Sequence, residues 1–135
     1  MVTELETIMI YLQRRYNILR EIGRLTDELT EAIERRDMIS AGLIMEMRGE
    51  QMERHAACEG ELMQITEKVP EFQKELYQVA FGSIEQIPDT LKGCQDEKEV
   101  WIRQKIYEIR SHTQTLIEEI RSRDDRITRK VKQKR

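Results

Sequence analysis

Apolar residues recur every seven positions along the first part of the chain, and this spacing constrains the fold more than any other feature. Seven of nine positions in two such series are apolar. The series are Leu5, Leu12, Leu19, Thr26 and Ile33, and Ile8, Arg15, Ile22 and Leu29. Such a seam favours a helix that packs lengthwise against other helices, as in a coiled coil. A helix over residues 3–36 is roughly 50 Å long, which predicts an elongated molecule.

A second helix is predicted over residues 38–68, because the seven-residue spacing starts again there in a different phase. Met38, Met45, Met52 and Glu59 are seven residues apart. A second series, offset by four residues, is Gly42, Gly49, Ala56 and Met63, and its first three members are small. Basic residues before Asp37 suit a helix end, and Asp37 suits the cap of the next helix. We expect a hairpin here; one continuous helix is the alternative, because no Gly or Pro marks the turn.

The methionines of the second helix allow two interpretations. Each Gly inside a helix costs about 1 kcal/mol relative to Ala, but its small size lets another helix come close. Thioether side chains adapt to irregular neighbours. Met38, Met45 and Met52 therefore either pack into the chain's own core or line a groove for an amphipathic segment of a partner.

Residues 69–95 connect the second and third long helices. Pro70 interrupts the helical pattern, and a short periodic apolar stretch then ends at Gly82. Pro88 stops the turn that begins at Ser83. These residues fit a short helix, a kinked continuation of the second helix, or an irregular crossover.

A third long helix is predicted over residues 96–131, where six of eight seam positions are apolar. The seam consists of Ile102, Ile106, Ile109, Thr113, Leu116, Ile120, Arg123 and Ile127. We therefore expect a single all-α domain over residues 1–135. Its architecture would be an elongated antiparallel three-helix coiled-coil bundle, with a short helix or a kinked crossover between the second and third helices.

Groups that carry catalysis or bind metals are sparse. His55 and Cys58 are three residues apart on one predicted helical face, but no second Cys/His pair has the spacing of a structural zinc site. The sequence has no Gly-rich phosphate loop and no nucleophile elbow. We expect a protein that is not an enzyme and needs no metal or cofactor.

Charge is nearly balanced, with a net charge of −3, but its distribution is uneven. Residues 121–135 hold eight Lys or Arg and two Asp. This basic segment is either a solvated helix end or a surface for an acidic partner, a membrane surface or phosphates. Because no aromatic residue lies among its charges, we expect no nucleic-acid binding.

Hydropathy and cysteine content bear on location. No stretch approaches the roughly 20 apolar residues of a membrane-spanning helix, and the first residues lack the pattern of a signal peptide. The two cysteines suggest no disulfide framework. We expect a cytoplasmic protein without a membrane span.

Two stretches carry a family pattern: Ala32 to Asp37, and Leu43 to Arg48 followed by Met52. A long first helix ending in an apolar-plus-Asp turn, with an Arg several turns into the next helix, makes the chain resemble bacterial flagellar export chaperones of the FlgN/FliT type. The resemblance covers mainly residues 5–65, with a compatible heptad helix at 100–127. The basic end after residue 120 is not part of the family pattern.

The resemblance implies a cytosolic three-helix antiparallel coiled coil that holds hook-associated proteins, those of the junction or the cap, unassembled before export. It also implies that a mobile C-terminal helix takes part in substrate binding. By position, that contact would include Ile106, Ile109, Thr113, Leu116 and Ile120.

Physical reasoning leads to a binding function as well. Three long helices in a chain of 135 residues leave each helix few neighbours, so apolar stripes stay partly uncovered. An uncovered stripe binds an amphipathic helix of a partner protein. The alternative is a homodimeric coiled-coil scaffold, in which self-association covers the stripes, or an adaptor that acts through the basic residues 121–135.

Overall fold

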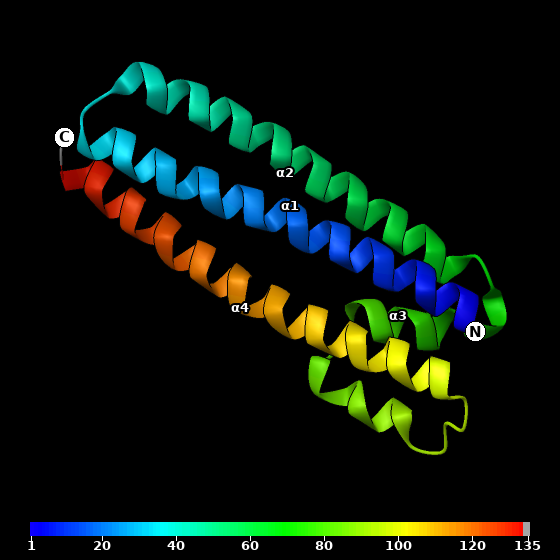
Figure 1. Ribbon diagram of the computed structural model, residues 1–135. Coiled ribbons are helices and arrows are strands. Elements are labelled where there is room, and N and C mark those ends of the chain that lie inside the picture. Colours follow the sequence, from blue (N-terminus) through cyan, green and yellow to red (C-terminus); the bar gives the residue numbers. More distant parts are fainter. Residues whose placement is uncertain (134–135) are drawn as a thin grey trace.

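The computed structural model describes residues 1–133, and every regular element within them is helical (Figure 1). The long helices are α1 (Val2–Glu34), α2 (Met38–Glu67) and α4 (Glu97–Gln133), and α3 (Gln73–Phe81) is short. Three 3-10 turns complete the connection: η1 (Pro70–Phe72), η2 (Ile84–Gln86) and η3 (Pro88–Leu91). The prediction of an all-α fold is confirmed.

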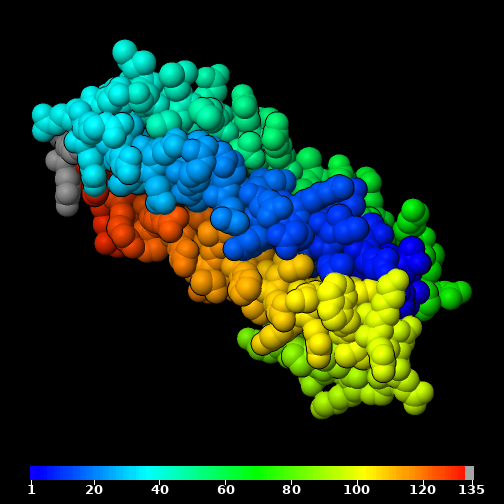
Figure 2. Space-filling model, viewed as in Figure 1, coloured from blue at the N-terminus to red at the C-terminus, as the bar shows by residue number. Residues whose placement is uncertain are grey.

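α1 lies between α2 and α4 and packs against both (Figure 1). α4 runs in the same direction as α1, and α2 runs in the opposite direction. The space-filling view shows a long, narrow body in which α1 is visible between the other two long helices (Figure 2). Because α1 packs against both α2 and α4, its two apolar series are buried along most of its length.

The chain reverses between α1 and α2 through a tight turn that contains no glycine. Arg36 adopts a left-handed conformation with φ of 60°. The amides of Arg36 and Asp37 donate to the carbonyls of Ile33 and Ala32 at 3.0 and 2.9 Å, which is a Schellman cap. Asp37 then caps α2, accepting from the Ser40 amide at 3.1 Å and from its hydroxyl at 2.6 Å.

Helix caps account for the small differences between predicted and observed helix ends. α1 ends at Glu34 rather than at residue 36, because Arg36 has left the right-handed helical conformation. Asp96 caps α4, accepting from the amides of Lys98 and Glu99 at 2.9 and 3.3 Å. The connection over residues 69–95 contains the short helix α3, followed by the turns η2 and η3.

Buried apolar side chains form three clusters along the molecule. The proximal cluster, near the chain's N-terminus, has ten members: Leu5, Ile8, Leu12, Leu62, Leu76, Val79, Ala80, Ile87, Ile102 and Ile106. The middle cluster is Leu19, Ile22 and Ile120. The distal cluster, near the α1–α2 turn, is Leu29, Ala32, Ile33 and Ala41. Packing is therefore much thinner at the distal end.

Candidate functional site

A groove of about 1140 Å³ opens at the distal end of the molecule. α1 supplies its floor, the first turns of α2 form one wall, and the last turns of α4 form the other. The apolar part of its lining is Leu29, Ile33, Met38, Ala41, Met45, Ile127 and Val131. We call this feature the distal groove.

The wall formed by α2 is apolar but contributes little to the core. Before Cys58, the only buried residue of α2 is Ala41. Met38 is 67% exposed and Met45 is 61% exposed, and both line the groove. Met52 is also exposed, further along the same helix. The predicted methionine stripe is therefore surface in the free chain and does not fill its core.

Arg48 joins all three long helices beside the groove. Its Nε donates to the hydroxyl of Thr26 on α1 at 3.0 Å, and its Nη2 donates to both carboxylate oxygens of Asp124 on α4 at 2.8 Å. The Arg48 side chain is only 16% exposed, and charge-assisted bonds of this kind are stronger than neutral ones. Arg48 thus sets the spacing between the α2 and α4 walls.

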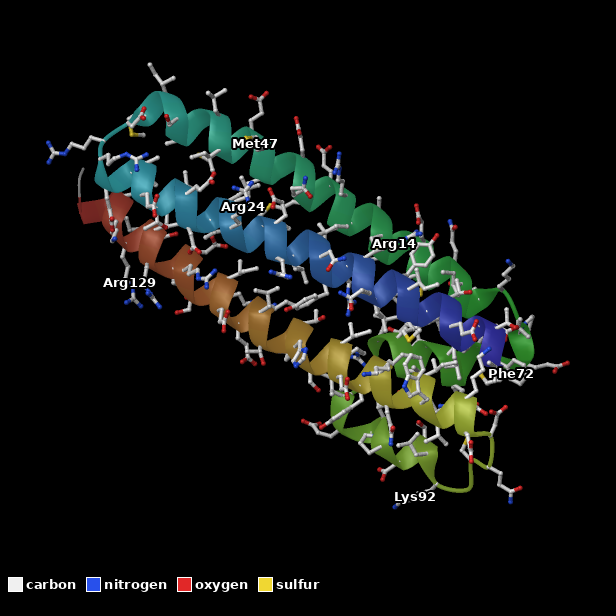
Figure 3. The ribbon with its side chains drawn as sticks, viewed as in Figure 1. Arg14, Arg24, Met47, Phe72, Lys92 and Arg129 are labelled. Carbon is white, nitrogen blue, oxygen red and sulfur yellow. The ribbon has the colours of Figure 1, made fainter. Side chains whose placement is uncertain are left out.

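Asp124 was not among the predicted site residues, because it lies within the basic segment 121–135. One signal could have found it: a lone acidic pair, Asp124 and Asp125, in a stretch of cations. Within the described part of this segment, the residues continue α4 and partly pair with α1. Arg123 contacts Asp27 at 3.4 Å, and Lys130 contacts Glu34. Arg129 points away from α1 (Figure 3); Lys134 and Arg135 lie outside the described residues.

The predicted contact residues of α4 lie against α1 in this structure. Ile106, Thr113 and Ile120 are buried. Ile109 packs on the proximal cluster and Leu116 on the middle cluster, each partly buried. In the free chain α1 already occupies this face. A partner reaches it only after α4 has moved away, so the prediction of α4 as a contact surface stays a prediction.

α3 fills, at the proximal end, the kind of space that the distal groove leaves open. Its Leu76, Val79 and Ala80 are buried in the proximal cluster with side chains of α1, α2 and α4. The α1 residues on both ends belong to the same two heptad series, so α3 and the groove lie over the same face of α1.

Two arginines of α4 hold α3 in place. Arg103 donates to Glu75 at 2.7 Å, and Arg110 donates to the carbonyls of Val79 and Gly82 at 3.1 and 2.5 Å. These bonds satisfy carbonyls at the end of α3 that no intrahelical amide reaches. The short helix is therefore firmly attached to α4.

Titratable groups in the middle of the molecule gather around the ion pair of Arg15 and Glu59. His55 Nε2 lies 3.5 Å from Glu59, and Arg15 Nη1 lies 3.8 Å from the same carboxylate. Burial lowers the pKa of His55, and burial raises the pKa of the nearby Cys58 thiol. Within the described residues, His, Cys, Asp and Glu side chains gather nowhere in a set of three that could hold a metal ion.

No protein-family model, curated protein or solved structure matches this chain. None of the helices within residues 1–133 combines the length and the apolar character needed to span a membrane.

Proposed function

We propose that this chain is a non-enzymatic binding protein that holds an amphipathic helix of a partner protein in the distal groove. The position of α3 carries the proposal. At the proximal end, a short helix with apolar residues at i, i+3 and i+4 packs over α1 between α2 and α4. A partner helix with an apolar face of the same spacing would complete the distal end in the same way.

The chemistry of the groove supports a helical occupant. The floor offers Leu29 and Ile33, and the walls offer the flexible thioethers of Met38 and Met45, which adapt to partners of different shape. Burying this surface contributes roughly 25 cal/mol per Å² of apolar area. Arg36 also lines the groove, and its positive charge would favour one register of the bound helix over others.

We infer that the three long helices form an elongated antiparallel three-helix coiled coil, closed at one end and open at the other. The seven-residue spacing of the buried Leu5, Leu12 and Ile33 supports this architecture. The opposite direction of α2 relative to α1 and α4 supports it as well.

From the resemblance, we propose a cytoplasmic flagellar export chaperone that keeps hook-associated junction or cap proteins unassembled before export. Both stretches that carry the resemblance border the distal groove. Residues 32–37 comprise the end of α1 and the α1–α2 turn, and Arg48 forms the contact between the walls. A role of that kind needs an exposed apolar surface for a helix, which the groove supplies.

A homodimeric scaffold is the second candidate. Ile39 and Leu43 favour it, because they are 83% and 59% exposed and are not part of the groove lining. Large apolar side chains that are exposed close together on one helix are typical of a surface that another chain covers.

Affinity capture with matched variants tests the proposal. Val131→Glu places a charge on the α4 wall, and Tyr77→Glu places one on α3, outside the groove; both residues are already exposed. We expect wild-type protein and Tyr77→Glu to retain the same partner from the native cytosol. We expect Val131→Glu to lose it, since an uncompensated charge would be buried under the bound helix.

The partner's contact segment, mapped by hydrogen exchange, should be one amphipathic helix. Equal retention of the partner by both variants would show that the groove is not the binding site. Recovery of this chain alone would favour the homodimeric scaffold.

A further inference from the structure

One face of α2 alternates large and small residues over residues 38–56. Met38, Gly42, Met45, Gly49, Met52 and Ala56 follow one another at steps of four and three, so they form a single stripe along the helix. We call it the Met/Gly stripe. Its residues are exposed, except Gly49, which is half-buried. The stripe is roughly 27 Å long at the rise of an α-helix.

No close contact and no backbone conformation within the described chain requires glycine at Gly42 or Gly49. A Cβ atom added at Gly42 or Gly49 would meet nothing within 4 Å, and neither residue has a left-handed backbone. Each nevertheless costs the helix about 1 kcal/mol relative to alanine. Close approach from outside the chain is the physical use that is left for two such residues on an exposed apolar face.

The stripe is its own complement when two copies run antiparallel. Let residue 47 lie level with residue 47 of a second copy. Met38 then lies level with Ala56 of the second copy, Gly42 with its Met52, and Met45 with its Gly49. The same pairs recur on the other side of the two-fold axis. Each of the six levels therefore holds one methionine and one small residue, which is the condition for close and even helix packing.

A parallel pairing does not have this property. It would place methionine level with methionine and glycine level with glycine, so the helices would be held apart at some levels and leave voids at others. A foreign partner would need a matching pattern of its own. It would not require this stripe to be symmetric about residue 47, whereas a second copy in a closed two-fold dimer does.

We propose that α2 pairs with α2 of a second copy of this chain, antiparallel, through the Met/Gly stripe. The methionines of each copy lie over the glycines and the alanine of the other. Met38 and Met45 also belong to the α2 wall of the distal groove. If the groove binds a partner helix as proposed above, self-association covers part of that site, and partner and second copy compete for it.

Sedimentation velocity over a range of protein concentrations tests the dimer. Leucine at Gly42 and Gly49 fills the spaces that the methionines of the second copy need. Gly60→Leu is the matched control: it replaces a glycine of the same helix, also with open space above it, one turn beyond the paired length. We expect dimers for wild type and Gly60→Leu, and monomers for Gly42→Leu with Gly49→Leu.

Thermal unfolding of the same protein samples checks that the variants are folded. Both stripe substitutions remove a helix glycine, and a Cβ at either position meets nothing within 4 Å. At concentrations where the wild type is monomeric, we therefore expect an unchanged or higher Tm. A wild-type chain that stays monomeric at every concentration would overturn the proposal. So would a stripe variant that still forms dimers.

Cysteine cross-linking tests direction and register. In a Cys94→Ser background, Met38→Cys mixed with Ala56→Cys should form an intermolecular disulfide, because the two positions are level across the interface. Met38→Cys alone should not, because its two copies lie at opposite ends of the stripe. Cross-linking of Met38→Cys with itself, and not with Ala56→Cys, would indicate a parallel pairing and contradict the proposal.

Different experimental results would contradict the proposed dimer and the proposed partner site. Val131→Glu lies on the α4 wall and should leave self-association unchanged while partner binding is lost. Loss of dimers in the stripe variants, with no partner captured by any variant, would leave the dimer standing and remove the proposed function. Partner capture that depends on Val131, by a chain that never dimerises, would do the reverse.

Discussion

The two ends of the molecule use the same three long helices and reach different results. At the proximal end, α3 lies over α1 between α2 and α4, and ten apolar residues are buried together. At the distal end no element of the described chain takes that place, only four residues form the cluster, and a groove opens. Three helices in a row therefore do not seal an apolar face by themselves, and a fourth segment is required to cover it.

The largest expected effect tests whether the proximal end carries the stability. Leu76→Ala removes a fully buried side chain of α3 and should lower the free energy of unfolding by about 2–5 kcal/mol. Met45→Ala at the distal groove should change it by at most about 0.5 kcal/mol, because Met45 is largely exposed. Urea denaturation measures both. Similar losses for the two variants would mean that the ends are equally packed.

The contact between the groove walls should have an intermediate effect. Arg48→Met leaves the carboxylate of Asp124 and the hydroxyl of Thr26 without their shared donor, and should cost about 1–2 kcal/mol. Hydrogen exchange should accelerate in the last turns of α4 and not at the proximal end. Arg24→Met is the control, because Arg24 pairs with Glu21 and Glu28 on an exposed face of α1 alone.

The smallest effect concerns the cap at the distal turn. Hydrogen bonds from the Ser40 hydroxyl and amide lower the pKa of Asp37. The folded chain therefore binds a proton at this carboxylate less readily than the unfolded chain. The stabilisation is complete above the unfolded pKa of about 4 and is lost as pH falls through the lower folded pKa.

Thermal unfolding of wild type and Asp37→Ala at several pH values measures this effect. The wild type should be more stable at neutral pH, and the difference should shrink in acid. A difference that does not depend on pH would show that the cap acts without its charge.

The sequence was most informative where one residue pattern has one physical meaning. Heptad spacing in residues 5–33 predicts a long helix packed on other helices, and burial of Leu5, Leu12 and Ile33 agrees with it. The α1–α2 turn was harder to predict, because Arg36 occupies a left-handed position that glycine usually takes.

The candidate site could be predicted only in part. Methionine at heptad positions fits either a core or a groove, and the choice depended on whether another segment covers α2. Neither the contact of Arg48 with Asp124 nor the placement of α3 over α1 could be predicted. Both join residues far apart in the chain, and no local pattern encodes such a distance.

The order of the elements along the chain has a consequence for how the protein is made. Three residues join α1 to α2, whereas α4 follows after the whole of α2 and the connection over residues 69–95. As the chain leaves the ribosome, the α1–α2 hairpin can therefore form early through local contacts. Until α4 is synthesised, Leu19 and Ile22 of that hairpin lack their later neighbour Ile120. The nascent hairpin is thus the stage of synthesis at which aggregation is most to be expected.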